Sequence, residues 1–229
     1  MKVIIGVVVV VLIALGAWFV MGSGVKAPGE DSATPTNAEG RSVVTSGTYR
    51  LDPVQSEFKW AGKKPLIEGY INSGTIGVTD GTVIVDGTKV QGVFSLDMNT
   101  LKVGLTAAKP GKEGALEGHL KSDKFFDVAK YPVANFTIKS VTPTSDSDTT
   151  FVYVITGDLV MKGKTNEISF PATIFQKDGV LTAEAQTEID RTKWDLTYGS
   201  GNFFEDLGDN LIDDMVAVSF KVVAPLVRP

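Results

Sequence analysis

The sequence has no cysteine, a single histidine and no excess of basic residues, and each absence removes a class of function. Without cysteine there is no disulfide, thiolate metal site or cysteine nucleophile. Because His119 is the only histidine, a multi-histidine metal site is excluded and any catalytic triad would have to use it. The formal net charge of -5 argues against a nucleic-acid partner, which normally selects a basic face. We therefore expect no catalytic residue, no metal and no cofactor, so that the chain is not an enzyme.

Residues 3–21 form a long apolar run without any charged side chain, directly after Met1 and Lys2. As a helix rising about 1.5 Å per residue, the run would span roughly 28 Å, close to the hydrocarbon thickness of a bilayer. We expect residues 1–21 to be a single-pass transmembrane anchor, with the rest of the chain on the extracytoplasmic side. A cleaved signal peptide is the alternative, although its apolar region is usually only about 7–15 residues long.

Residues 22–46 are rich in Gly, Ser, Pro, Thr, Asn and Ala and show no apolar periodicity. Such a segment buries too little apolar surface to offset the entropy of ordering. We expect it to be a flexible linker between the anchor and a domain that covers residues 47–224.

From Gly47 onward, apolar residues recur at every second position, the period of strands with one face buried. The clearest runs are 54–60, 90–98, 168–174, 183–189 and 216–222, with a weaker one at 151–155. Asp-Gly pairs at 80–81, 86–87 and 178–179 are typical of hairpin turns. About eight short strands separated by turns predict an all-β, antiparallel up-and-down barrel or a sandwich.

The period-two pattern is absent from residues 111–132, which contain glycine, lysine and acidic residues around a few apolar positions. The spacing predicts one or two short helical turns, with Ser122 as a candidate N-cap for the turn that starts at Asp123. A short helical insertion in an all-β chain often covers one end of a barrel.

The same segment resembles the YceI-like family of lipid- and polyisoprenoid-binding proteins, in which a stretch of the form HL-x-S-x-x-F-F-D precedes Tyr-Pro and a strand. Here it reads from Gly118 to Asp127, followed by Tyr131-Pro132 and Phe136. Three further pieces agree in order: Tyr49-Arg50-Leu51-Asp52 with Ser56, Gly157-Asp158-Leu159 with Lys162-Gly163-Lys164-Thr165, and Ile189-Asp190-Arg191 to Val222. Gln55 and Glu68-Gly69-Tyr70 depart from positions where many members have histidine, which puts any histidine-dependent role in doubt.

The resemblance implies an extended, eight-stranded lipocalin-like antiparallel barrel with an elongated apolar cavity. Binding, transport or sequestration of a polyisoprenoid or similar amphipathic lipid would then be the function. From the residues alone, a packed core is the more common content of a small barrel, and periodicity does not separate it from a lined cavity. A lipid-modifying enzyme and a solid-barrel interaction module therefore stay open as alternatives.

If the barrel is hollow, the expected ligand-contacting residues are inward-facing aromatic and aliphatic side chains. They are Phe58, Trp60, Phe94, Leu96, Phe126, Phe136, Phe170 and Trp194. Small inward residues, including Ala172, Ala183, Ala185 and Gly92, would leave room between these rings. His119, in the helical insertion, is a candidate for the lid or for contact with a lipid headgroup, although a purely structural role is the commoner one.

Overall fold

The structure is a computed structural model that describes residues 44–106, 110–144 and 152–228. All of these residues belong to one compact unit, Thr34–Pro229. The expected anchor at 1–21 and nearly all of the expected linker at 22–46 lie outside the described residues. Within the described ranges, no helix combines the length and the apolar character needed to cross a bilayer.

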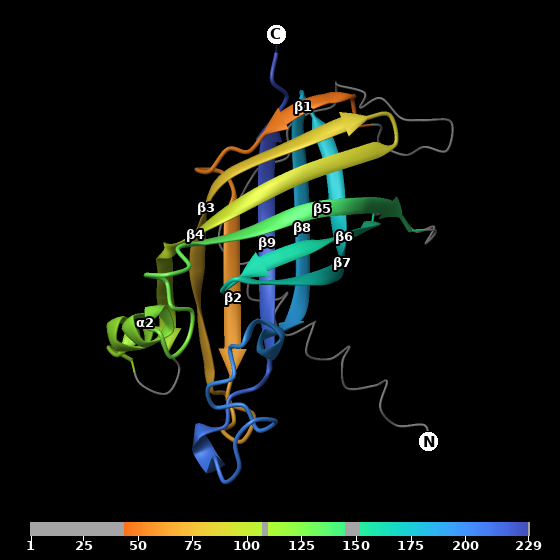
Figure 1. The fold of residues 1–229 in the computed structure, drawn as a ribbon. Coiled ribbons are helices and arrows are strands. Elements are labelled where there is room, and N and C mark those ends of the chain that lie inside the picture. Colours follow the sequence, from red (N-terminus) through yellow and green to blue (C-terminus); the bar gives the residue numbers. More distant parts are fainter. Residues whose placement is uncertain (1–43, 107–109, 145–151, 229) are drawn as a thin grey trace, which may run out of the picture. The chain divides into compact units, whose positions relative to one another are not determined.

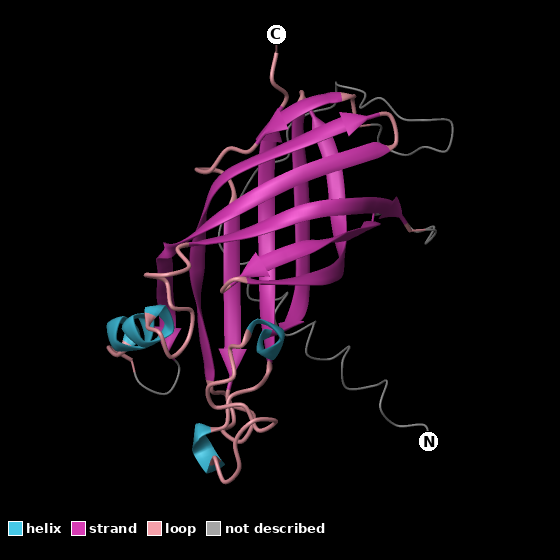
Figure 2. Cartoon of the chain, in the orientation of Figure 1, coloured by secondary structure: helices cyan, strands magenta, loops and turns pink. Residues whose placement is uncertain are grey.

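The described residues form an all-β domain (Figures 1 and 2). Its strands are β1 (Gly47–Arg50), β2 (Glu57–Lys63), β3 (Ile71–Asp86), β4 (Lys89–Thr106), β5 (Val133–Pro143), β6 (Val152–Met161), β7 (Lys164–Lys177), β8 (Val180–Asp190) and β9 (Met215–Pro225). One α-helix, α2 (Glu113–Lys121), and two 3₁₀ helices, η1 (Arg191–Trp194) and η2 (Gly208–Asn210), complete the described elements.

Eight strands, β2 to β9, form a closed antiparallel ring. Each pairs with the next along the chain, and β9 returns to pair with β2, from Glu57↔Lys221 to Ala61↔Ala217. β1 lies outside this count because it pairs with the far end of β3, from Gly47↔Val85 to Arg50↔Thr82, whereas β2 pairs with the near end. The expected antiparallel eight-stranded barrel with one short helix is confirmed.

The hairpin turns agree only in part with the expected Asp-Gly pairs. Asp178 and Gly179 have φ values of 52° and 79° and connect β7 to β8, as a type I′ turn requires. Gly87 (φ 59°) connects β3 to β4. Asp80-Gly81 is not a turn, because β3 continues through it beside an irregularity in its register with β4. That irregularity bends a long strand where the sequence suggests its end.

The helical insertion is confirmed, but its capping differs from the expectation. Ser122 ends α2, and the expected turn follows at 123–126, where the Ser122 carbonyl oxygen accepts from the backbone N–H of Phe125. The Ser122 hydroxyl does not cap that turn, because it donates to the carbonyl oxygen of His119 at 2.7 Å. Leu120 is buried in the same core cluster as Met98 of β4. Glu117 accepts hydrogen bonds from Lys102 of β4 and from Lys121, at 3.1 and 3.0 Å. The helix is therefore fixed to β4, and Figure 1 shows it beside one end of that strand.

Buried apolar residues gather in separate clusters along the barrel. One, around Met98, Leu120 and Trp194, lies near α2 and η1. A second, around Tyr49 and Leu181, lies near β1. A smaller third cluster contains Phe170. The walls between these clusters are lined by half-buried apolar side chains, which is the first sign that the interior is not filled.

Candidate functional site

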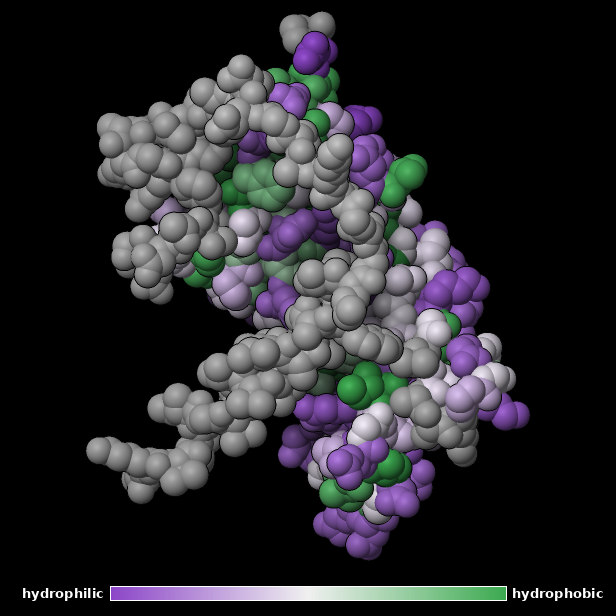
Figure 3. All heavy atoms as spheres, turned by 180° about the vertical axis from the view of Figure 1, so that it is seen from behind, coloured by the Kyte–Doolittle hydropathy of each residue, from purple (hydrophilic) through white to green (hydrophobic). Residues whose placement is uncertain are grey.

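The inside of the ring is a cavity of about 750 Å³. This volume falls in the range of about 300–1,000 Å³ that is typical of small-molecule sites. Every strand of the ring contributes to the lining, and most contributions are apolar. Figure 3 shows hydrophobic atoms set back in a hollow behind nearer hydrophilic ones. The choice between a packed core and a lined cavity is thus settled in favour of the cavity.

The cavity is elongated along the strands. It extends from Thr88, in the β3–β4 turn, to Lys64 and Tyr70, in the β2–β3 connection. Along β8 the lining runs from Leu181 to Ile189. At about 3.4 Å per residue this part of the wall alone is roughly 27 Å long. Such a shape suits a long, thin ligand better than a compact one.

Seven of the eight aromatic and aliphatic residues expected on the wall line the cavity, as does His119. Those seven are Phe58, Trp60, Phe94, Leu96, Phe126, Phe136 and Phe170. Trp194 differs from the expectation: it is fully buried beside the cavity, and its Nε1 donates to the carbonyl oxygen of Leu159 at 3.0 Å. The short helix η1 turns its ring into the core. Ligand contact by the other residues stays a prediction.

Three aromatic rings on the wall lie over glycines of the neighbouring strand. Phe94 and Trp60 are paired directly with Gly81 and Gly74. A Cβ atom on Gly81 would lie 2.7 Å from the Phe94 ring, and one on Gly74 would lie 2.8 Å from the Trp60 ring. Phe136 covers Gly157 in the same way. Because a glycine has no side chain, each ring can pack flat against the sheet instead of projecting into the lumen.

A second aromatic group joins three strands across the cavity wall. Phe170 of β7 contacts Phe136 of β5 and Phe220 of β9, with ring centroids 5.6 and 5.2 Å apart. Ala172 and Ala185, which are paired between β7 and β8, belong to the same cluster as these rings. Phe220 was not among the expected site residues, although the period-two run at 216–222 places it on the inward face.

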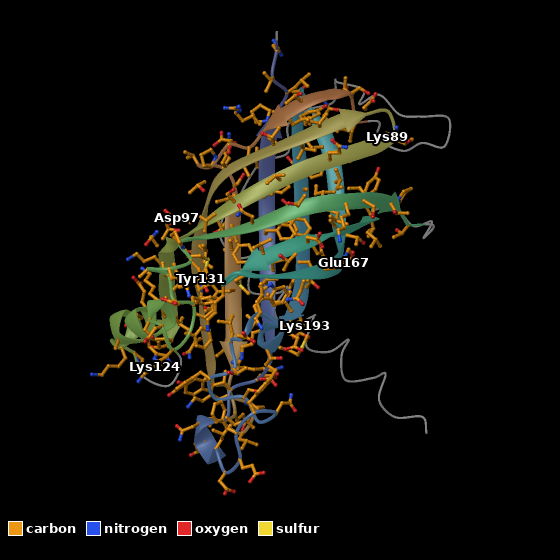
Figure 4. All side chains as sticks on the ribbon, viewed as in Figure 1. Lys89, Asp97, Lys124, Tyr131, Glu167 and Lys193 are labelled. Atoms are coloured by element: carbon orange, nitrogen blue, oxygen red, sulfur yellow. The ribbon has the colours of Figure 1, made fainter. Side chains whose placement is uncertain are left out.

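Polar groups on the wall are concentrated at the end near the β2–β3 connection. They include Lys63, Lys64, Asn72, His119 and Arg191. The His119 ring packs edge-on against Tyr198, with centroids 4.7 Å apart. By contrast, the charged residues Lys89, Glu167 and Lys193 are exposed, and Figure 4 shows them on the outside of the barrel. The cavity therefore has an apolar body and one polar end.

Arg191 organises the segment 195–214 at this polar end. Its side chain is 2% exposed and donates to the carbonyl oxygens of Asp213, Leu196 and Ile212. It also forms an ion pair with Asp214 at 3.2 Å. Burial lowers the pKa of Arg191, and the charge of Asp214 opposes this shift. An arginine remains charged at such a site because its ordinary pKa lies far above neutral pH.

In the acidic segment 205–214, the carboxylates nearest to Arg191 are those of Asp213 and Asp214, and both help to hold the segment in place. Asp214 accepts hydrogen bonds from Ser200 and Asn202 in addition to Arg191. Asp213 pairs with Lys63 at 3.2 Å and thereby connects the segment to β2. Asp213 and Asp214 therefore hold segment 195–214 in place beside the polar end of the cavity.

Comparison with known proteins identifies the family. The sequence model of the YceI-like domain family matches residues 49–224. A UPF0312 protein of Pseudomonas putida is 35% identical over 101 residues, which are 44% of this chain and 47% of that protein. One of Shewanella denitrificans is 34% identical over 94 residues, 41% of this chain and 44% of that protein. The chain thus spans about half the length of the curated relatives it matches.

Two solved structures share the fold. BcnA of Burkholderia cenocepacia superposes with a TM-score of 0.59 at 20% identity, over 76% of this chain and 98% of its own. A polyisoprenoid binding domain from Saccharophagus degradans, implicated in plant cell wall breakdown, gives 0.57 at 14% identity, over 80% and 100%. At these identities the likeness shows the fold alone. The family match covers nearly the whole described barrel, and the chain belongs to the YceI-like domain family.

Proposed function

We propose that the barrel binds and carries a polyisoprenoid or a similar long-chain amphipathic lipid, with the apolar tail in the cavity. The elongated apolar cavity of about 750 Å³ is the observation that carries this proposal. Two comparisons support it: the family match, and a structural neighbour that is itself described as a polyisoprenoid binding domain.

Burial of the tail would supply the affinity. Each Å² of apolar surface removed from water contributes roughly 25 cal/mol, so several hundred Å² contribute several kcal/mol before the costs of association. No directional contact to the tail is needed. Selection among lipids would then depend on the length of the cavity and on the polar groups at its end.

A binding role fits the surroundings of His119 better than catalysis does. Its ring contacts the rings of Tyr198 and Phe125. In the part of the chain that the structure describes, its imidazole has no hydrogen bond to a carboxylate that would orient it as a general base. We therefore treat His119 as a ligand-contacting residue at the polar end of the cavity and not as a catalytic residue.

We further propose that the apolar run at 3–21 holds the barrel at the extracytoplasmic face of a membrane. A barrel tethered there could exchange lipids with the adjacent leaflet. Fractionation of cells that express the full chain would test this. The full chain should remain with membranes after a high-salt wash, and deletion of residues 3–21 should abolish both export and membrane retention. Recovery of the full chain in the soluble fraction would refute the anchor.

The binding proposal is tested with two substitutions on β8 that point to opposite faces. Ala183 lines the cavity, whereas Gln186 is exposed on the outside. Ala183→Leu narrows the lumen and should reduce the amount of long-chain lipid that copurifies with the full chain, measured by extraction and mass spectrometry. Gln186→Leu should leave it unchanged. Equal lipid content in both variants, or none in the unmodified protein after incubation with polyprenol, would contradict the proposal.

A further inference from the structure

Two buried polar atoms on the cavity wall have no hydrogen-bond partner among the described residues. They are the indole Nε1 of Trp60, a donor, and the amide Oδ1 of Asn72, an acceptor. Both side chains line the cavity. An unsatisfied polar group buried in this way destabilises a protein unless something else provides its partner. A donor and an acceptor without protein partners, on two side chains that line the same cavity, point to a partner that has both properties.

The strand register places these two residues around one notch in the wall. Trp60 of β2 is paired with Gly74 of β3, and Gly62 of β2 with Asn72 of β3. The two polar residues are therefore diagonal neighbours, about 7–8 Å apart along the sheet. The glycines occupy the other diagonal. A Cβ atom on Gly62 would meet nothing within 4 Å, so that the notch is open space.

The cations at this end of the cavity are already engaged. Lys63 pairs with Asp213 at 3.2 Å, and Lys64 donates to the carbonyl oxygen of Asp209 at 2.7 Å. Arg191 is held by Asp214 and three carbonyl groups. A phosphate or pyrophosphate would have to compete with Asp213 for Lys63 and with Asp214 for Arg191, which reduces what it gains from these two cations. The polar end therefore offers a charged group less than its number of basic residues suggests.

We propose that the notch between Trp60 and Asn72 is a subsite for a hydroxyl group, so that the preferred ligand is a long-chain prenyl alcohol and not its phosphate. The hydroxyl oxygen accepts from Trp60 Nε1, and its proton is donated to Asn72 Oδ1. This inference rests on the proposed lipid-binding function and specifies the chemical class of the lipid.

The test compares three C40 ligands that share one prenyl chain: the alcohol, the parent hydrocarbon and the monophosphate. The purified full chain is incubated with equimolar mixtures, separated by gel filtration, and the retained lipids are quantified by mass spectrometry. The unmodified protein should retain the alcohol about tenfold over the hydrocarbon and over the monophosphate. Trp60→Phe, which keeps a ring over Gly74 but removes the donor, should reduce the preference over hydrocarbon by about tenfold, the effect of one buried hydrogen bond.

Two further variants keep the result interpretable. Asn72→Leu should lower the preference for alcohol as Trp60→Phe does, and Gly62→Val, which fills the notch, should do the same while hydrocarbon is still retained. Retained hydrocarbon shows that each variant is folded and hollow. Preferential retention of the monophosphate, or an alcohol preference unchanged in Trp60→Phe and Asn72→Leu, would overturn the subsite. Failure of the unmodified protein to retain any of the three ligands would instead refute the proposed function.

Discussion

Phe136 of β5 lies across Gly157 of β6, so close that a Cβ atom on Gly157 would come within 2.5 Å of the ring. The same Cβ atom would also collide with the carbonyl oxygen of Thr137. Backbone and ring together leave room only for glycine. The arrangement keeps a large ring against the wall and thereby determines how wide the lumen is at that height.

Gly157→Ala should therefore destabilise the barrel by about 1–3 kcal/mol, because overpacking forces the Phe136 ring or the strand to move. The same substitution at Gly118, on the exposed side of α2 where a Cβ atom meets nothing within 4 Å, should stabilise by about 0.5–1 kcal/mol. Urea unfolding of the two variants measures both effects. A neutral Gly157→Ala would mean that the ring has more freedom than the structure shows.

Asn72→Leu should raise the stability of the lipid-free protein by about 1 kcal/mol, because it removes a buried acceptor without a protein partner. Asn135→Leu provides the contrast. Asn135 accepts a hydrogen bond from Ser95 at 2.8 Å, so its replacement should destabilise the barrel. Thermal unfolding after delipidation separates the two variants. A destabilised Asn72→Leu protein would show that Asn72 has a structural partner.

Arg191→Ala should cost about 3–5 kcal/mol, since it leaves Asp214 as a partly buried charge without its counter-ion. Arg191→Lys should be intermediate, because an ammonium group cannot reach all the acceptors that the guanidinium contacts. Arg50→Ala, at an exposed position on β1, is the control and should change stability by less than about 0.5 kcal/mol. Limited proteolysis should show earlier cleavage within 195–214 in Arg191→Ala, and equal cleavage rates would argue against the role of Arg191.

The attachment of α2 should weaken in acid. Hydrogen bonds from Lys121 and Lys102 lower the pKa of Glu117 below its ordinary value of 4.5. The carboxylate therefore stabilises the fold above that value, and the contribution is lost as the pH falls through the lowered pKa. Glu117→Gln should lower the melting temperature at pH 7 but have little effect near pH 3. Glu188→Gln, an exposed residue on β8, should not show this difference.

The strands that alternate cleanly, such as 168–174 and 216–222, could be predicted from the sequence because a half-buried strand imposes period two on its residues. β3 could not, since its Gly-rich and polar stretch around Gly74 and Gly77 has no such pattern and gains its inward face only from pairing with β2 and β4. Asn72 was missed for that reason. Trp194 was misplaced because a 3₁₀ helix, which has no period-two signal, sets its direction.

Similarly, the sequence could not show that the barrel is hollow. Whether Phe94, Trp60 and Phe136 fill the lumen or lie along its wall depends on glycines of the neighbouring strands. These glycines are directly opposite Phe94 and Trp60 and diagonal to Phe136, and this register is a property of the closed ring. Only the family resemblance favoured a cavity in advance. The glycine–aromatic pairs provide the physical reason that the residues alone did not.

Because β9 closes the ring, the barrel has an enclosed lumen only once β9 is in place. Among the described strands β9 is the last to be synthesised, yet it separates β2 from β8 and pairs with both. Until it joins them, the preceding strands form an open sheet with two free edges and no enclosed lumen. Under the proposed function, a lipid could therefore be enclosed only after β9 has joined the ring. A factor that supplied the lipid would act on the closed barrel and not on a nascent one.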